Sequence, residues 1–229
     1  MHVPDGIIEP WIWILLLIVS ACVIVFSIYK LSKDEKYDME KMIPFIGIMA
    51  AFIFAAQFVN FPVAPLVSGH LVGGVLVAVL LSPYAGAIVM TLVLLVQMLF
   101  GDGGITVIGL NIFNMGVIGC FLGFLIVFGL VKILKGKIDD KSNLLISTGI
   151  ASYITIVLAA LLLGIEISLS SSITQLSPTT NLILIEFLVF WHAIIGIGEV
   201  LITCAVLAFI MKAKPELIST NELLELSFE

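Results

Sequence analysis

The sequence predicts an all-α, polytopic membrane protein with seven transmembrane helices. Of its 229 residues, 61% are hydrophobic and only 11% are charged. Mean hydropathy is +1.26, and the apolar share lies well above that of soluble domains, which are about half apolar. The net charge of −6 comes partly from the C-terminal stretch PELISTNELLELSFE, and no basic patch indicates binding to nucleic acid.

Seven apolar segments, separated by turn residues and charges, account for the predicted helices. They cover residues 11–30, 43–59, 69–81, 84–100, 106–133, 144–166 and 182–211. The stretch 66–100 is interrupted by Ser82-Pro83. As a single helix it would be roughly 52 Å long, whereas the hydrocarbon core of a membrane is roughly 30 Å thick. We therefore expect two short helices in this stretch.

The first apolar segment is expected to be a retained helix and not a cleaved signal peptide. A secretory signal begins with a positively charged region, whereas MHVPDGIIEP carries two acidic residues and no lysine. The apolar run that follows is about 20 residues long, which is enough to cross a membrane. Met1 would then be the N-terminus of the mature protein.

Lysine placement predicts the orientation, because basic residues gather in cytoplasmic loops close to helix ends. All ten basic residues are lysines, and they form three groups: Lys30, Lys33, Lys36 and Lys41; Lys132, Lys135, Lys137 and Lys141; Lys212 and Lys214. Seven spans place all three groups on the cytoplasmic side, whereas six spans would put the middle group outside. We expect the N-terminus outside, the C-terminus inside, and loops 60–68, 101–105 and 167–181 on the outer face.

Two of the three histidines lie at the predicted outer face. His2 belongs to the opening MHVPDG, and His70 follows the lysine-free outer loop in SGHLVGG. Met1 offers its α-amine, and His2 offers its backbone nitrogen and Nδ1, so these three nitrogens form fused chelate rings once the amide is deprotonated. His70 would supply a fourth nitrogen. Four nitrogens in a plane suit Ni(II) or Cu(II), with Co(II) weaker; an ordinary hydrogen-bonded role for both histidines is the alternative.

The expected domain organisation is a single transmembrane domain over residues 1–229. Residues 1–10 would form an extracellular metal-binding segment, residues 11–211 the seven helices, and residues 212–229 a cytoplasmic acidic tail. Asp5 and Glu9 are expected to anchor or cap the N-terminal segment. If the ion is not bound by nitrogen, the carboxylates of Asp5, Glu9 and Asp102 are the alternative ligands. The three cysteines, Cys22, Cys120 and Cys204, lie in apolar runs without CxxC spacing, so we interpret them as buried hydrophobic residues.

Four motifs together resemble the nickel/cobalt-binding M subunit, the substrate-capture (S) component, of energy-coupling factor (ECF) transporters. They are MHVPDG at the start, SGHLVGG at 68–74, GDGGITVIGLNIFNMGVIG at 101–119 and HAIIGIGE at 192–199. The resemblance implies an extra N-terminal helix ahead of a six-helix S-component core, with Met1, His2 and His70 as ligands of the transported Ni(II) or Co(II).

The same resemblance implies partners in a prokaryotic cell membrane, namely a transmembrane T subunit and two cytoplasmic ATPases. It leaves open whether a small accessory membrane subunit is needed, and it implies no organic cofactor. The chain has no GxxxxGK[ST] phosphate loop, so we expect the partners to hydrolyse ATP. Ala51 and Ala55 stand four residues apart and let another helix approach closely. Internal packing is the alternative, but similarity to the family's T-subunit contact helix favours a partner surface.

Four further polar residues are candidates for supporting the metal site. Asn111 and Asn114 are three residues apart near the outer end of the fifth segment, where their amides could orient His2 or His70. Ordinary hydrogen bonding between helices explains them equally well. His192 and Glu199 are seven residues apart, nearly on one face of the last helix. We expect a structural pair or network that holds the helices, with direct metal binding as the alternative.

The favoured function is therefore metal capture for an ATP-driven importer, in which nitrogen ligation favours nickel over cobalt. A stand-alone secondary metal-ion carrier is the main alternative. An intramembrane metal-dependent hydrolase that uses His192 and Glu199 is the least favoured, because the H-E-x-x-H motif of such zinc enzymes is absent. We thus expect a transport subunit and not an enzyme.

Overall fold

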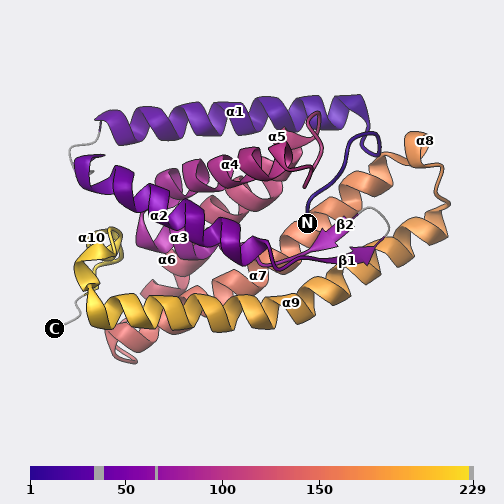
Figure 1. The fold of residues 1–229 in the computed structure, drawn as a ribbon. Coiled ribbons are helices and arrows are strands. Elements are labelled where there is room, and N and C mark those ends of the chain that lie inside the picture. Colours follow the sequence, from indigo (N-terminus) through magenta and orange to yellow (C-terminus); the bar gives the residue numbers. More distant parts are fainter. Residues whose placement is uncertain (34–38, 65–66, 227–229) are drawn as a thin grey trace.

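Most of the chain forms helices that run side by side along one axis (Figure 1). The computed structural model describes residues 1–33, 39–64 and 67–226. The longer helical elements are α1 (Pro10–Lys33), α2 (Met39–Gln57), α4 (Pro83–Leu99), α7 (Asp140–Leu169), α9 (Pro178–Ala213) and the continuous run α5 (Ile108–Asn111), η1 (Ile112–Leu122) and α6 (Gly123–Leu134). The short elements are β1 (Phe61–Ala64), β2 (Val67–Gly69), α3 (Gly74–Leu80), α8 (Ser171–Thr174), η2 (Pro215–Leu217) and α10 (Asn221–Leu224).

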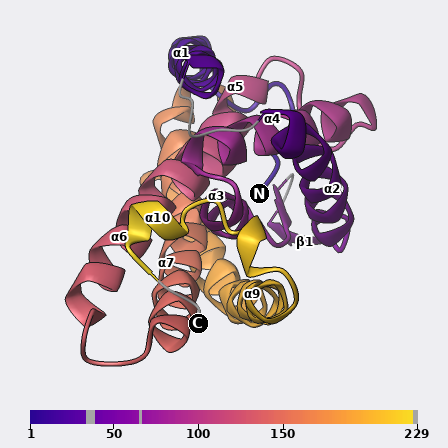
Figure 2. The ribbon, with the colours of Figure 1, turned by 90° about the vertical axis from the view of Figure 1, so that its left-hand side faces the viewer.

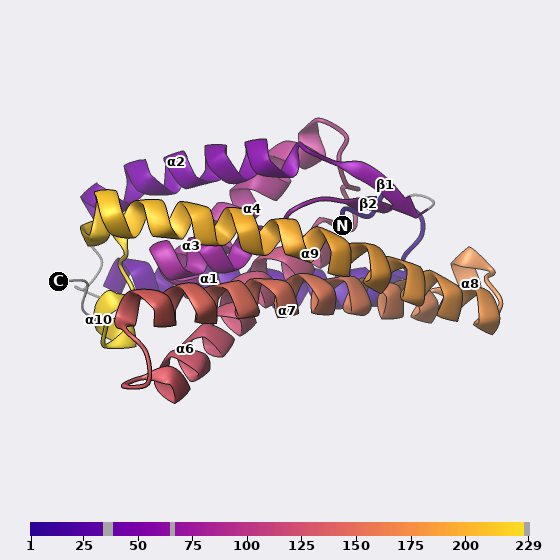
Figure 3. The same cartoon turned by 90° about the horizontal axis from the view of Figure 1, so that it is seen from below.

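Four helical segments of the described chain are long and apolar enough to cross a membrane. They are α1, the run from α5 to α6, α7 and α9, while α2 and α4 are shorter apolar helices. The two longest helices, α7 and α9, lie side by side over most of their length (Figure 3). These features agree with the predicted multi-pass helical membrane protein.

The third predicted segment differs from the expectation. Its predicted end at Ser82-Pro83 is confirmed, because the Ser82 side chain caps α4 by accepting a hydrogen bond from Ala85 N at 3.2 Å. Residues 69–81, however, were expected to form one helix, and only Gly74–Leu80 are helical. At about 1.5 Å per residue, α3 is roughly 10 Å long, too short to cross a membrane alone.

The all-α prediction also missed a β-hairpin. Strands β1 and β2 pair antiparallel, with Phe61 opposite Gly69 and Pro62 opposite Ser68. Proline disfavours a helix in its own position and in the residue before it, and the sequence FPVAP carries two prolines in five residues. The chain runs out along β1 and returns along β2, and residues 70–73 then lead into α3.

The centre of the bundle is α3, which Figure 2 shows surrounded by the longer helices. All seven of its residues are buried, and it contacts α4, η1, α6, α7 and α9. Small residues make this close packing feasible: a Cβ on Gly74 would lie 3.0 Å from backbone atoms of Gly119 in η1. A short helix therefore becomes the core of the bundle.

One end of the bundle carries the described lysines and the C-terminal region. The end of α1, the α6–α7 connection and the end of α9 meet there, beside α10 (Figure 1), while Lys36 lies outside the described residues. The predicted acidic tail is partly folded, since Ser219 N donates to the Leu80 carbonyl at 2.8 Å. It thereby caps the last turn of α3. Residues 227–229 of the tail are outside the described chain.

We expect Gly109→Ala to displace α1, because a Cβ on Gly109 would overlap the Leu17 Cα of α1 and a backbone atom cannot rotate away. The free energy of unfolding should fall by about 1–3 kcal/mol. Gly129→Ala in α6 is the matched control, because its Cβ would meet nothing within 4 Å, and it should be neutral or stabilise by up to about 1 kcal/mol. Thermal unfolding in detergent measures both; equal melting temperatures would contradict the packing.

Candidate metal centre

Residues 1–9 turn back into the bundle, so the N-terminus lies close to β2 and not in solvent (Figure 1). Met1, His2 and Val3 are all buried. The backbone of Val3 is held on both sides: its N–H donates to Asn111 Oδ1 at 3.3 Å, and its carbonyl accepts from Gly104 N at 2.8 Å. The first three residues are thus part of the core.

Asp5 anchors this segment to the loop that follows α4. Its carboxylate accepts hydrogen bonds from Ile105 N at 3.0 Å and from Thr106 N at 2.8 Å. The loop needs glycine at two positions: Gly103 has a φ of 102°, and a Cβ on Gly104 would overlap Asp5. The GDGG motif therefore provides the surface on which the N-terminal segment docks, as expected of an anchoring Asp5.

His2 and His70 are brought together, although they are far apart in the sequence. Their rings stack with centroids 4.5 Å apart and planes 26° from parallel. His2 Nε2 is 2.9 Å from Gln97 Oε1, and His70 Nδ1 is 2.6 Å from the Leu71 carbonyl oxygen. Because both partners are oxygen acceptors in these contacts, each of these ring nitrogens carries the proton.

The other nitrogen of each ring is buried without a hydrogen-bond partner in the described part of the chain. These atoms are His2 Nδ1 and His70 Nε2. In a neutral imidazole the nitrogen without the proton has a free lone pair. A buried polar atom without a partner requires an explanation, and two such lone pairs on adjacent rings are suited to bind a metal ion.

The N-terminal amine lies at the same site, where it donates to Ser68 Oγ of β2 at 3.5 Å. Burial lowers its pKa to about 4, an effect that the Asp102 carboxylate partly opposes. Burial and the neighbouring amine lower the pKa of His2 to about 3, against the hydrogen bond that His2 donates to Gln97. At neutral pH both groups are therefore in the unprotonated form that metal binding requires.

Asp102 supplies negative charge beside these nitrogens. Its Oδ1 lies 3.2 Å from His2 Nδ1, and its Oδ2 accepts from Asn60 at 3.3 Å. An ion pair with His2 would require a protonated ring, which the lowered pKa of His2 opposes. The contact therefore places a carboxylate next to a lone pair, an arrangement that a cation between or beside them would stabilise.

The two asparagines and the two alanines singled out in the sequence have different surroundings. Asn111 holds the Val3 backbone next to His2, whereas the Asn114 amide donates to Glu166 Oε2 at 2.7 Å. Neither contact is with a histidine ring. Ala51 and Ala55 are exposed on the outer face of α2, so the described helices do not use this pair for internal packing.

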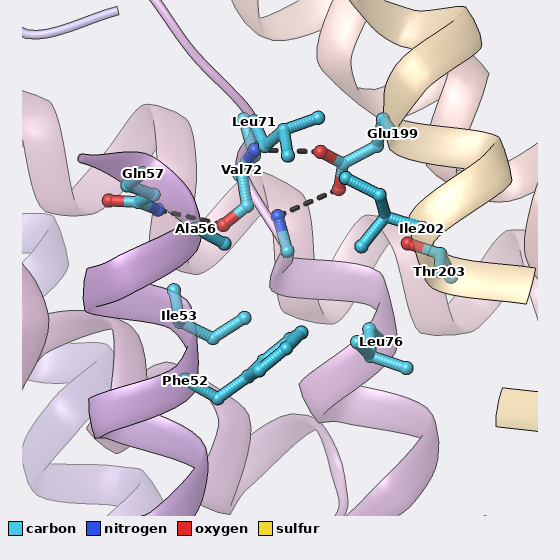
Figure 4. Close-up of a pocket in the computed structure, with 11 residues that line it drawn as sticks. Phe52, Ile53, Ala56, Gln57, Leu71, Val72, Leu76, Glu199, Ile202 and Thr203 are labelled. Carbon is cyan, nitrogen blue, oxygen red and sulfur yellow. Dashed lines mark hydrogen bonds between the residues drawn. The ribbon is translucent and has the colours of Figure 1, made fainter. Parts of the chain in front are cut away.

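His192 and Glu199 have separate partners. His192 Nδ1 donates to the Leu188 carbonyl one turn earlier in α9, at 2.8 Å. The buried Glu199 carboxylate accepts from Val72 N at 2.8 Å and from Gly73 N at 2.7 Å (Figure 4). Glu199 thus joins α9 to the segment between His70 and α3.

Sequence reasoning missed two buried glutamines beside the site, Gln97 near the end of α4 and Gln57 at the end of α2. Both are almost fully buried, and they hydrogen-bond to each other at 3.0 Å. A signal was available, because each is a lone polar residue in an apolar segment, FAAQF and LLVQMLF, and polar groups in such segments are costly unless paired.

Comparison with known proteins adds independent information. Residues 2–217 match the family model described as cobalt uptake substrate-specific transmembrane region. The chain is 38% identical over 219 residues to a putative fused nickel transport protein of Archaeoglobus fulgidus, covering 95% of this chain and 68% of that protein. It is 33% identical over 231 residues to a putative metal transport protein of Methanocaldococcus jannaschii, covering 97% and 96% of the two chains.

A solved structure has the same fold. The crystal structure of a transition metal transporter superimposes with a TM-score of 0.79 at 27% identity, covering 97% of this chain and 99% of that chain. A truncated transition metal transporter gives a TM-score of 0.77 at 28% identity, covering 93% and 99%.

We expect Glu199→Gln to loosen the segment that carries His70. A carboxylate accepts from two N–H groups, whereas an amide must turn one donor towards a donor, leaving a buried N–H without a partner at a cost of about 1–3 kcal/mol. Glu186→Gln, an exposed position in the same helix, is the matched control. Thermal unfolding and Ni(II) titration in detergent compare the two variants. If Glu199→Gln matched Glu186→Gln in both measurements, the contact would not support the site.

Proposed function

We propose, since the chain belongs to the cobalt uptake substrate-specific transmembrane family, that it is the substrate-capture subunit of an ATP-driven ECF importer. Its substrate would be Ni(II) or Co(II). Relatives named as nickel and as cobalt transport proteins support a transporter and not an enzyme. The observation that carries the proposal is the meeting of two unpartnered ring nitrogens and a buried neutral amine at one place.

The proposed ligands are four nitrogens: the Met1 amine, the His2 backbone nitrogen, His2 Nδ1 and His70 Nε2. Met1 and His2 supply three of them in fused chelate rings, so the chelate comes from one short piece of backbone. Loss of the amide proton adds one negative charge, and the Asp102 carboxylate adds a second nearby. Together these charges match a divalent ion in a site that is otherwise buried. Planar nitrogen ligation favours nickel.

The proposed topology has seven spans, with the N-terminus outside and the C-terminus in the cytoplasm of a prokaryotic cell. The third span would consist of β2, residues 70–73 and α3, with the non-helical part buried in protein, as irregular backbone must be within a membrane. The lysine-bearing ends would all be cytoplasmic, in keeping with the positive-inside rule. In Figure 1, α10 lies at this same end of the bundle.

The proposed partners are a transmembrane T subunit and two cytoplasmic ATPases, with a small accessory membrane subunit as an open component. The exposed Ala51 and Ala55 on α2 would contact the T subunit. Relatives that are named as fused transport proteins support association with further components. Metal uptake by cells that produce this chain with and without the partners separates an importer subunit from a stand-alone carrier.

We expect one residue added before Met1 to abolish tight Ni(II) binding, because the α-amine would move away from the His2 nitrogens. Isothermal titration in detergent measures the loss. Hydrogen exchange of the Ile105 and Thr106 amides, which donate to Asp5, reports whether the segment is still docked. Wild-type affinity in the extended protein would contradict the chelate.

We expect His70→Ala to cost most of the Ni(II) affinity, because it removes the fourth nitrogen. Asn111→Ala should cost about 10–100-fold, as is usual for a residue that supports the ligands without binding the metal. His192→Ala removes an equally buried ring and is the matched control. If it weakened binding more than His70→Ala does, the ion would lie deeper in the bundle than proposed.

A further inference from the structure

Two buried glutamines connect the His2 ring to the backbone that follows His70. His2 Nε2 is 2.9 Å from Gln97 Oε1, Gln97 Nε2 is 3.0 Å from Gln57 Oε1, and Gln57 Nε2 is 2.7 Å from the Val72 carbonyl oxygen. Figure 4 shows the last of these bonds. Gln57 is 0% and Gln97 2% exposed, so the three hydrogen bonds form a relay that is shielded from water.

The direction of this relay is decided at its far end. The Val72 carbonyl can only accept a hydrogen bond, so Gln57 must turn its NH2 group towards it. The oxygen of Gln57 then faces Gln97, which must donate with its own NH2 group. The oxygen of Gln97 consequently faces His2, and His2 Nε2 must carry the ring proton. Turning either amide around would oppose two donors or two acceptors.

The Val72 peptide is itself held in place. Its N–H donates to Glu199 at 2.8 Å, and the next N–H, of Gly73, donates to the same carboxylate at 2.7 Å. In Figure 4 both bonds lie on the Glu199 side of this segment, and the bond from Gln57 to the Val72 carbonyl lies on the opposite side. The acceptor that orients the relay therefore belongs to a backbone segment that cannot easily rotate.

The relay acts against a local preference of His2. The Asp102 carboxylate lies 3.2 Å from His2 Nδ1 and would favour a proton on that nitrogen. A proton on Nδ1 would occupy the lone pair that the metal chelate needs, because metal binds the unprotonated nitrogen. The neutral ring can carry its proton on Nδ1 or on Nε2. The hydrogen bond made by Nε2 decides which of these two forms is present.

We propose that Gln97 and Gln57 are positioning residues that hold His2 in the Nε2–H tautomer and so keep Nδ1 free for the transported metal. This inference rests on the proposed function, because it assigns a role to residues around the same ligands. Gln97 acts directly on the ring. Gln57 acts through Gln97, by fixing which end of that amide faces the histidine.

A double-mutant cycle separates this role from simple packing. Gln57→Leu frees the Gln97 amide to turn and should weaken Ni(II) binding about 10–100-fold, the range for groups that orient a ligand. Gln97→Glu replaces the amide with a carboxylate that accepts from His2 Nε2 in either orientation. The carboxylate cannot donate to Gln57 Oε1, so the bond to Gln57 is lost while the His2 contact stays, and affinity should remain within about threefold of wild type. In the Gln97→Glu background, Gln57→Leu should then have no further cost. Gln97→Met, which removes the acceptor, should lose affinity as Gln57→Leu does.

The tautomer is measured directly on the full-length, metal-free protein in detergent. Nitrogen-15 NMR of histidine-labelled protein distinguishes a protonated from an unprotonated ring nitrogen, and His2→Ala identifies the signals. We expect His2 to carry its proton on Nε2 in wild type and in Gln97→Glu. In Gln57→Leu and Gln97→Met a share of the signal should move to the Nδ1–H form.

Three results would overturn the inference. They are a wild-type His2 protonated on Nδ1, a tautomer unchanged by Gln57→Leu, and an equal loss of affinity from Gln57→Leu in both backgrounds, which would indicate packing alone. Failure of the proposed function is recognised separately. If wild type did not bind Ni(II) or Co(II), the function would be wrong, while the NMR measurement would still decide whether the relay sets the tautomer.

Discussion

The fold depends on how the backbone of residues 70–73 is satisfied within an apolar bundle. Backbone N–H and C=O groups in such surroundings must find partners in the protein, and irregular segments are tolerated only where such partners exist. Here the partners are buried side chains: Glu199 accepts from two consecutive N–H groups, and Gln57 donates to the carbonyl between them. The chain can therefore remain irregular inside the bundle, begin α3 at Gly74 and place His70 just before it.

The same irregular segment explains how His70 reaches the position of a proposed ligand. A helical residue has its backbone groups paired within the helix, and its side chain follows the helix surface. His70 lies outside β2 and α3, so its ring can bond its neighbour's carbonyl at Leu71, stack on the His2 ring and leave its Nε2 without a hydrogen-bond partner among the described residues. Broken secondary structure thus frees a ring nitrogen inside a buried site.

The N-terminal segment completes the site as a separately docked piece. Asp5 and the Val3 backbone attach it to the 101–106 loop and to Asn111, so its first three residues are placed without a helix of their own. Burial makes the terminal amine neutral, and Asp102 supplies the charge that a bound cation would balance. Docking, deprotonation and charge balance are consequently linked, because each results from the same insertion of residues 1–5 into the bundle.

The amino-acid sequence alone determined the membrane class, the order of apolar segments and the break at Ser82-Pro83, because these depend on local composition and on backbone restrictions of single residues. It also indicated Met1, His2 and His70 as the candidate ligands, a prediction that remains to be tested. Tertiary structure decided the hairpin, the shortness of α3, and the partners of Gln57, Gln97 and Glu199. Those contacts join residues 15 to 127 positions apart in the chain. Helical periodicity says which face a residue occupies, but not which distant group its amide or carboxylate meets, and that pairing exists only once the helices have packed.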